Sequence, residues 1–410
     1  MNNVLAIIGE YNPFHNGHLY HLNTSKKMCS ADYTILIMTG NFTQRGDTSI
    51  IDKWTKTQTA LLNGIDLVIE LPTIYSISSA ENFASGAIKI LDELRIVDNI
   101  SFGSEVDDIE ILDRCAEVLY EEPDEFISVL EHELSKGISF PKARENALLI
   151  YLNDIRKYAN VLSSPNNILG IEYLKALKKY SSPIQPITVK RNSVEYNSVR
   201  AENNFASSTA IRKMIENNNL HELRECMPEN SYELVANSIK LGHFILSLKV
   251  FEKQIIYNFR KMSKEEIANL PDVSEGLDNL IKYAAESCNT LEEFINIVKS
   301  KRYAQTRIQR ICLYTLLGYT KQDMEISKKI NPYVRILGFN SKGKKILSEI
   351  ANSNNKIQIV TSVKKFETTC KNKKLLSLLK KDIYATDVYT LGFDKNSYSG
   401  LDYTNKIVSM

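Results

Sequence analysis

Three histidines lie close together near the start of the chain, at a spacing that suits phosphate binding. His15, Gly17 and His18 form an H-x-G-H sequence, and His21 follows. Imidazole rings and the free backbone N–H groups of a helix start can both donate hydrogen bonds to phosphate oxygens. An ordinary strand-to-helix turn and a metal site remain alternatives. No cysteine or carboxylate stands at ligand spacing with the histidine pair, so we predict no metal site.

The elements around these histidines are those that a phosphate-binding loop requires. The apolar run 4–8 predicts a buried strand, and Pro13 and Gly17 interrupt the backbone after it. An apolar series from Leu19 to Met28 then predicts a helix, which Asn16 can cap. The positive end of the helix dipole would therefore face the same point as both imidazoles.

Strand and helix patterns alternate from residue 1 to about 105, which predicts an α/β fold with a Rossmann-like parallel sheet. Segment 106–160 has a helical pattern and is predicted to interrupt the sheet, and 186–191 has the pattern of its last strand. We predict three regions: a catalytic domain over 1–220, a helical domain over 221–330, and a small basic α/β appendage over 331–410 that binds RNA together with the helical domain.

Ligands of such sheets bind beyond the carboxyl ends of the strands, so polar residues there are candidates. Asn41 and Arg45 follow the second strand and could hold a carboxylate, and Gly103 would allow close approach of a nucleotide. Further candidates follow later strands or begin later helices: Glu70, Asn166, Asn167, Lys190, Arg191, Ser208, Thr209 and Arg212.

Composition adds limits on partners and compartment. The 410 residues carry a net charge of +2, but 301–410 holds 21 basic against 8 acidic residues, a local charge of +13. Such a region favours contact with a polyanion, although a solvated lysine-rich surface remains an alternative. The six cysteines are scattered, and no signal peptide or membrane-length apolar run is present, so we expect a cytoplasmic protein with reduced thiols.

A basic cluster precedes a predicted helix in this charged region. The helix has an apolar stripe that includes Ile308 and Leu316, and the opposite side is predicted to bind RNA phosphates and to stack on an unpaired base, although a solvated face remains an alternative. The predicted RNA-binding residues are Lys301, Arg302, Tyr303, Arg307 and Arg310. The sequence from Lys261 to Lys264 resembles a synthetase K-M-S-K loop, but Ser263 and Glu266 favour a helix-capping box instead.

The H-x-G-H turn resembles the nucleotidyltransferase superfamily related to class I aminoacyl-tRNA synthetases. The longer string 10–18, Glu-Tyr-Asn-Pro-Phe-His-Asn-Gly-His, is similar to the bacterial tRNA(Met) cytidine acetate ligases. Matching segments recur almost to the end of the chain: 40–46, 66–72, 102–105, 165–170, 274–277 and 301–303 with Arg307 and Arg310. Gly9 and Ala304 depart from the pattern of the family.

This resemblance implies that acetate attacks the α-phosphate of ATP, accompanied by Mg²⁺, and that acetyl-adenylate acetylates N4 of the wobble cytidine of elongator tRNA(Met). His15 and His18 would be catalytic. Asn41 and Arg45 would line the acetate or substrate pocket, and Asn167 is favoured over Asn166 because it lies nearer the helix start. The implied ATP-binding residues are Ile7, Ile8, Gly9, Glu10, Tyr11, Asn12, Pro13, Phe14, His15, Asn16, Gly17, His18, Leu19, Tyr20, Gly103, Asn167, Lys190, Arg191, Ser208, Thr209 and Arg212.

Two other functions stay open at this point. An adenylyltransferase that makes a small nucleotide cofactor would share the first loop but would not need the basic C-terminal region. An RNA-binding protein with a degenerate nucleotide site would be expected to lack His15 or His18, and both are present. No obligate protein partner and no membrane association are evident.

Overall fold

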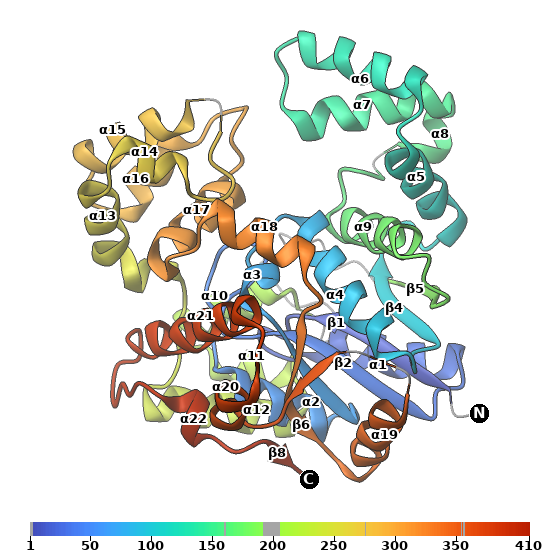
Figure 1. The fold of residues 1–410 in the computed structure, drawn as a ribbon, viewed down its shortest axis with the longest axis vertical. Helices are drawn as coiled ribbons and strands as arrows, with labels where there is room; N and C mark the ends of the chain where they lie inside the picture. Colours follow the sequence, from blue (N-terminus) through green and yellow to red (C-terminus); the bar gives the residue numbers. More distant parts are fainter. Residues whose placement is uncertain (1–2, 160, 192–205, 275, 354, 356) are drawn as a thin grey trace.

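An eight-stranded sheet organises the computed structural model, which describes residues 3–159, 161–191, 206–274, 276–353, 355 and 357–410 (Figure 1). Its strand order is β5-β4-β1-β2-β3-β6-β7, and β8 also pairs with β6. The first five strands are mutually parallel, which confirms the predicted α/β sheet. They are β1 (Val4–Gly9), β2 (Tyr33–Thr39), β3 (Leu67–Leu71), β4 (Asn99–Ser104) and β5 (Gln185–Lys190).

The strand order reverses at β1. The chain runs outward from β1 through β2 to β3, and it then crosses back to place β4 on the other side of β1. The carboxyl ends of β1 and β4 therefore flank the topological switch point, which is where open α/β sheets bind their ligands. Glu275, part of one of the segments that resemble the acetate ligases, lies outside the described residues.

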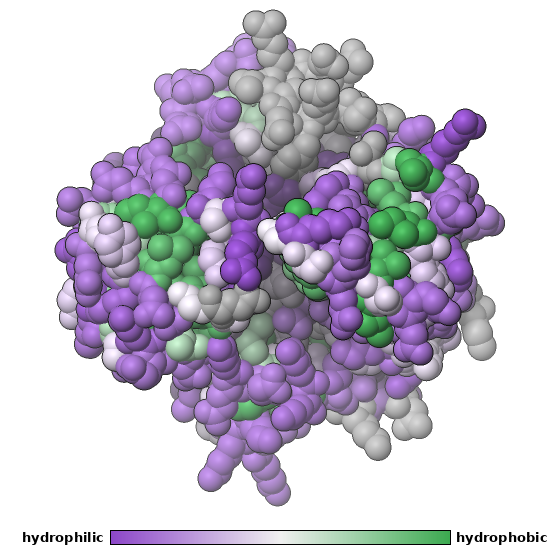
Figure 2. All heavy atoms as spheres, turned by 90° about the horizontal axis from the view of Figure 1, so that it is seen from above, coloured by the Kyte–Doolittle hydropathy of each residue, from purple (hydrophilic) through white to green (hydrophobic). Residues whose placement is uncertain are grey.

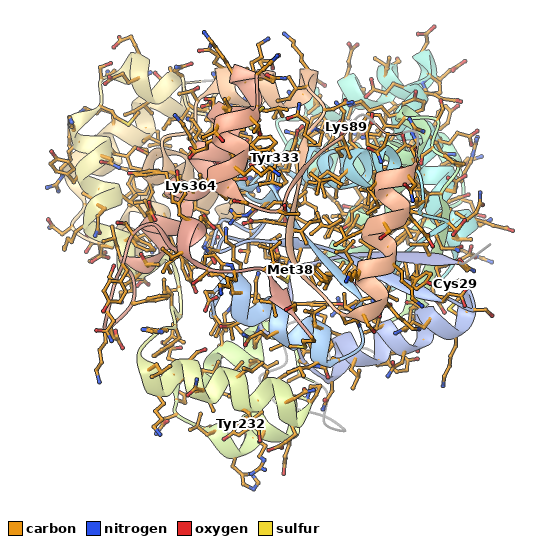
Figure 3. The ribbon with its side chains drawn as sticks, turned by 60° about the horizontal axis from the view of Figure 1, so that its bottom comes forward. Cys29, Met38, Lys89, Tyr232, Tyr333 and Lys364 are labelled. Carbon is orange, nitrogen blue, oxygen red and sulfur yellow. The ribbon has the colours of Figure 1, made fainter. Side chains whose placement is uncertain are left out.

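Helices cover both faces of the sheet, and the strands supply alternate side chains to the two resulting cores. In β2, Ile35 and Ile37 face the larger core, whereas Leu36 and Met38 face the smaller one (Figure 3). The smaller core is covered by α1 (Asn16–Met28) and α2 (Lys53–Leu62). The larger core is covered by α3 (Thr73–Ser76), α4 (Ala80–Leu94) and α9 (Pro165–Lys179).

The predicted helical insertion is present between β4 and α9. It consists of α5 (Ile109–Glu121), α6 (Asp124–Ser135), α7 (Phe140–Leu152) and α8 (Ile155–Tyr158). Figure 1 shows these helices as one of two lobes that rise above the sheet, and Figure 2 shows apolar patches on both lobes within a mostly hydrophilic surface. None of the helices within the described ranges is long and apolar enough to cross a membrane.

The middle of the chain is helical, as predicted. The Ser263 hydroxyl accepts a hydrogen bond from the Glu266 N–H, and the Glu266 carboxylate accepts one from the Ser263 N–H. These two bonds confirm the predicted capping box. The elements are α10 (Ser208–Glu216), α11 (Leu220–Glu225), α12 (Glu229–Leu241), the 3₁₀ helix η1 (Leu248–Phe251), α13 (Glu252–Lys261), α14 (Lys264–Ala268), α15 (Leu277–Ser287), α16 (Leu291–Val298), α17 (Gln305–Leu317) and α18 (Lys321–Lys329).

The structure differs from two predictions about the end of the chain. Residues 331–410 do not form a separate appendage, and 186–191 is not the last strand of the sheet. Strand β6 pairs antiparallel with β3, and β7 and β8 both pair with β6. The physical reason is that β3 would otherwise leave an unpaired, apolar edge exposed. The C-terminal elements are β6 (Tyr333–Phe339), α19 (Ser341–Asn352), β7 (Gln358–Val360), α20 (Val363–Thr369), α21 (Lys373–Thr390), α22 (Leu401–Thr404) and β8 (Val408–Ser409).

A buried ion network joins this region to the parallel strands. Lys53 Nζ lies 2.8 Å from an oxygen of Glu70 and 2.8 Å from an oxygen of Asp402. Arg335 bridges the same two carboxylates, at 3.4 Å from Glu70 and 2.6 Å from Asp402. Because all four side chains are buried, loss of one member would leave an uncompensated charge, which typically destabilises a protein by about 3–5 kcal/mol.

Asp382 on α21 lies beside this network. Its carboxylate accepts hydrogen bonds from the Thr73 N–H, at 2.8 Å, and from the hydroxyl of Tyr333. Burial and the nearby charge of Glu70 raise the pKa of Asp382 from 3.8 to about 7. The native protein therefore retains a proton that the unfolded chain releases between these two pH values.

We predict that Asp382 makes the free energy of unfolding fall as pH rises from about 4 to 7. The unfolded chain binds fewer protons than the native protein in this window, so rising pH favours unfolding. Asp382→Asn should flatten the slope, because asparagine does not titrate. Urea unfolding of both proteins at several pH values measures this. Equal slopes would show that Asp382 does not hold the additional proton.

Candidate functional site

The two histidines of the H-x-G-H turn cap helix α1 with their own rings. His15 is the N-cap residue, and its Nδ1 accepts a hydrogen bond from the Gly17 N–H at 3.1 Å. The His15 N–H donates in turn to Nδ1 of His18 at 3.3 Å. The two rings stack, with their centroids 3.7 Å apart. Because each Nδ1 accepts, the proton of each neutral ring must reside on Nε2.

Burial keeps these imidazoles neutral. Desolvation, followed by the charge of Arg191, lowers the pKa of His15 to about 3 and that of His21 to about 4. The pKa of His18 is also held well below its usual value, by burial first and then by its neighbours His15, Arg191 and His21. The rings of His15 and His18 are therefore neutral Nε2–H donors near neutral pH. Positive charge at this site comes from Arg191 and from the start of α1.

The end of β4 supplies the opposite side of the site. A Cβ added to Gly103 would lie 3.1 Å from Cγ of Arg191, so the glycine permits a close approach there. Arg191 follows β5 directly, and its Nη1 donates to Oδ1 of Asn166 at 2.9 Å. Lys190, the last residue of β5, is exposed. The structure thus places Gly103 against Arg191, whose charge also acts on His15, His18 and His21, and a contact of these residues with ATP stays a prediction.

Asn166 and Asn167 have different surroundings. Asn167 is fully buried, and its Oδ1 accepts from the Ser104 hydroxyl at 2.9 Å and from the Glu105 N–H at 3.0 Å. Asn166 is less buried and donates to the carboxylate of Glu105. Asn167 therefore fixes the exit of β4, and Asn166 lies nearer the surface beside Arg191. A contact of either residue with ATP stays a prediction.

Two buried polar atoms at this switch point have no hydrogen-bond partner within the described part of the chain. They are the hydroxyl of Tyr11 and Nδ2 of Asn167. The Tyr11 ring packs edge-on against Phe14 at 4.8 Å and lies 4.7 Å from the His18 ring. Buried polar groups are normally paired, so these atoms fit a site that receives a polar ligand.

The other residues of segment 7–20 divide between core and surface. Ile7 and Phe14 are buried in the smaller core, whereas Tyr20 is 38% exposed. Asn12 fixes the loop after β2: its Oδ1 accepts from the Ile50 N–H at 2.7 Å, and its Nδ2 donates to the Thr48 carbonyl at 3.3 Å. These side chains shape the loop.

The loop after β2, residues 40–52, contains both predicted acetate ligands. Asn41 is 4% exposed. Its Oδ1 accepts a hydrogen bond from the Lys53 N–H at 3.0 Å, and its Nδ2 donates to the Thr386 hydroxyl at 3.3 Å. Its side chain is thus engaged inside the protein, whereas Arg45 is partly exposed. The Gln44 N–H donates to the Glu10 carboxylate at 2.7 Å, which joins this loop to the end of β1. An acetate pocket here stays a prediction.

The predicted second anion site lies at α10. Ser207 caps this helix by accepting from the Ala210 N–H at 3.1 Å, while Ser208 and Thr209 occupy the first turn. Arg212 pairs with Asp47 of the β2 loop at 3.4 Å. Helix α10 therefore packs beside that loop, and its guanidinium is held by a carboxylate.

The sequence did not lead us to name Lys56 among the candidate site residues. Its side chain is fully buried, and its ammonium donates to the carbonyls of Glu10 and Thr39 at 2.9 and 2.8 Å. It also lies 3.1 Å from the Ser49 hydroxyl. A usable signal was present, because Lys53, Lys56 and Ala60 have the spacing of one helix face directly after a strand and its loop.

The predicted tRNA-binding cluster is only partly on the surface. Lys301 and Arg302 are exposed, but Tyr303 and Arg310 are each 8% exposed. Arg310 pairs with Asp272 at 2.9 Å, and Arg307 donates to the Asp272 carbonyl at 2.8 Å. The prediction that all five residues form an exposed basic face is therefore wrong for Tyr303 and Arg310. Their side chains lie against the folded chain and contribute to the packing of α17.

Helix α17 nevertheless lies beside the site. Gly46 of the β2 loop has a positive φ of 80°, and a Cβ there would meet the backbone of Arg310 at 2.5 Å. Only glycine fits this contact, which places the start of α17 next to the carboxyl edge of the sheet. Among the described residues, no group of three or more His, Cys, Asp or Glu side chains could hold a metal ion.

Known proteins share this architecture over the full chain. The family model described as HIGH Nucleotidyl Transferase matches residues 1–402. A tRNA(Met) cytidine acetate ligase from Thermoanaerobacter sp. (strain X514) is 46% identical over 409 residues, covering 99% of this chain and 100% of that protein. The ligase of Caldanaerobacter subterraneus subsp. tengcongensis is 42% identical over 408 residues, 99% of each chain.

Solved structures agree with the sequence relatives. The apo structure of Thermotoga maritima TmcAL matches with a TM-score of 0.95 at 34% identity, covering 100% of this chain and 99% of that chain. The same protein bound with alpha-thio ATP matches with a TM-score of 0.92, at the same identity and coverage. These matches confirm the resemblance that rested on segment 10–18, and the chain belongs to the tRNA(Met) cytidine acetate ligase family of HIGH nucleotidyl transferases.

Proposed function

We propose that this protein is an ATP-dependent tRNA(Met) cytidine acetate ligase that acetylates N4 of the wobble cytidine of elongator tRNA(Met). One observation carries the proposal: two neutral imidazoles, the start of α1 and Arg191 converge at the switch point between β1 and β4. The family supports the same assignment, since relatives of nearly equal length are tRNA(Met) cytidine acetate ligases.

In the first step, an oxygen of acetate attacks the α-phosphorus of ATP. The bond from that phosphorus to the bridging oxygen breaks, and pyrophosphate leaves with the electron pair. The Nε2–H groups of His15 and His18 would donate to phosphate oxygens on which charge increases, and Arg191 would supply positive charge. Holding both substrates in line can remove ~7–11 kcal/mol of the barrier in well-oriented cases.

In the second step, the cytidine N4 amine attacks the acetyl carbonyl carbon of acetyl-adenylate. The bond to the AMP oxygen breaks, AMP leaves, and the nitrogen loses one proton. Neutral imidazoles fit a site that must hold a phosphoanhydride without protonating the attacking amine. Acetyl-adenylate is an activated acyl donor, so we assign the protein chiefly a positioning role in this step.

The remaining parts of the proposal follow from this chemistry. We expect Mg²⁺ to enter with ATP, because phosphate oxygens are the hard ligands that it prefers. Residues 1–220 would form the ATP- and acetate-activating part, with the helical middle and the basic C-terminal region providing the tRNA surface. All six cysteines are free, which is consistent with a reducing cytoplasm. We assign no obligate protein partner.

The direct test is incubation with ATP, Mg²⁺, radiolabelled acetate and total tRNA, followed by nucleoside analysis. We expect label in N4-acetylcytidine that depends on ATP and on elongator tRNA(Met). Label in another nucleoside would overturn the substrate assignment. Formation of a nucleotide cofactor without acetate would instead favour an adenylyltransferase.

Replacing His18 should separate catalysis from tRNA binding. His18→Ala should lower acetate-dependent pyrophosphate release by about 100-fold or more, because one preorganised donor is lost. His18→Asn should be equally impaired, since its amide oxygen can replace the Nδ1 cap but not the Nε2 donor. Pyrophosphate release and tRNA affinity are both measured. The control is His132→Ala, an exposed histidine of α6. Unchanged turnover of either His18 variant would refute the assigned role.

Neutralising Lys301 and Arg302 together should weaken tRNA binding. These two exposed cations would lose their contacts with phosphates, and the slope of log affinity against log salt should fall by roughly two. A matched double variant, Lys27→Gln with Lys157→Gln, removes two exposed lysines outside the proposed tRNA surface and should bind normally. Equal salt slopes for both double variants would show that the Lys301 segment is only solvated.

A further inference from the structure

The ammonium of Lys56 connects three segments at the carboxyl edge of the sheet. It donates to the Glu10 carbonyl just after β1 at 2.9 Å and to the Thr39 carbonyl at the end of β2 at 2.8 Å. It also lies 3.1 Å from the Ser49 hydroxyl and 3.3 Å from the Thr39 hydroxyl. A single side chain thus contacts the exits of two neighbouring strands and the loop that follows β2.

The residues that Lys56 contacts are connected to the H-x-G-H turn and to the loop after β2. Glu10 begins the segment that runs into the His15 cap, so its carbonyl sets the direction in which the chain leaves β1. Ser49 donates to the Gly40 carbonyl at 3.2 Å, and its own carbonyl accepts from the Tyr389 hydroxyl at 3.0 Å. The β2 loop and the H-x-G-H turn are therefore held in one arrangement through Lys56.

We propose that Lys56 is a positioning residue for ATP activation, and that its charged ammonium holds the β1 exit and the β2 loop in the arrangement that accepts the triphosphate. This inference rests on the proposed function, because it names a residue that serves the same site. Lys56 does not touch the two catalytic imidazoles, so it acts through the backbone of Glu10 and through the loop. A protonated ammonium has three N–H groups for these oxygens, whereas a neutral amine has two.

Lys56 is surrounded by groups that affect its charge. The pKa of Lys56 is lowered from 10.5 to about 7, chiefly by burial and also by the charge of Lys53 on the same helix. Glu10 after β1, Glu70 on β3 and Asp52 before α2 act in the opposite direction. The pKa values of His15, His18 and His21 are all lowered from their usual value by burial, so these rings do not change charge between pH 7 and 9.

The pH dependence of stability and of ATP binding should therefore have opposite signs. Between about 7 and 10.5 the native protein loses the Lys56 proton while the unfolded chain keeps it, so this group raises the free energy of unfolding as pH rises. The same deprotonation loosens the loop arrangement and should weaken ATP binding. A purely structural lysine would not weaken ATP binding while the fold gains stability.

The test compares wild type, Lys56→Met and Lys53→Met between pH 6 and 9. Calorimetry with alpha-thio ATP gives Kd without turnover, pyrophosphate release with acetate gives kcat/KM, and urea unfolding gives stability. We expect wild-type ATP affinity to fall above pH 7. Lys56→Met should bind ATP on the order of 10–100-fold more weakly at pH 6.5, with a flat pH profile. Lys53→Met, which removes a buried lysine one turn away, should lose stability but still lose ATP affinity as pH rises, with the fall moved to higher pH because the charge of Lys53 lowers the pKa of Lys56.

The outcomes separate the two proposals. If Lys56→Met is folded and binds ATP like wild type, or keeps the pH dependence, Lys56 has no positioning role and the proposed ligase function stands. If Lys56→Met does not fold, the wild-type binding profile still decides, because a flat profile from pH 6 to 9 would overturn the inference. If wild type binds ATP but releases no pyrophosphate with acetate, the proposed function fails, and the binding data still test Lys56.

Discussion

The reciprocal cap between His15 and His18 is the interaction on which the site depends. Each Nδ1 is engaged by a backbone N–H, so the two rings are fixed in orientation and their protons are directed to Nε2. Burial then keeps both rings uncharged, which makes them hydrogen-bond donors of constant character over the neutral pH range. The same local cap thus starts the helix and orients the two rings for the phosphate binding that we propose, and Arg191 supplies the charge that the imidazoles lack.

The surroundings of this cap come from distant parts of the chain. Asn12 and Glu10 tie the first turn to the β2 loop, and that loop is held in turn by Tyr389 and Thr386 of α21. Gly46 allows the same loop to lie against α17. The helical and C-terminal regions therefore contribute to the support of the catalytic edge, in addition to any role in binding tRNA.

Local patterns predicted the parallel strands, the helical insertion and the H-x-G-H turn, because these follow from apolar period and turn residues within short windows. The pairing of β6 with β3 was not predictable in this way, since the apolar run of β6 carries no signal of its partner. Tyr303 and Arg310 looked like surface residues because basic and aromatic types usually are, yet Asp272 and packing against the folded chain draw them inward. Lys56 was missed although its spacing with Lys53 and Ala60 placed it on one helix face, because the acceptors that allow a lysine to be buried come together only in the folded chain.

The pairing of β3 with β6 also bears on synthesis at the ribosome. Leu67 pairs with Phe339, so this part of the sheet cannot form until residue 339 has been made, about 270 residues after β3. Until then, β3 presents an apolar strand edge to the crowded cell, which is a condition that favours chaperone binding. A nascent chain that stalls before β6 should therefore have the histidine turn but not the finished support around it, and it should be a target for quality control.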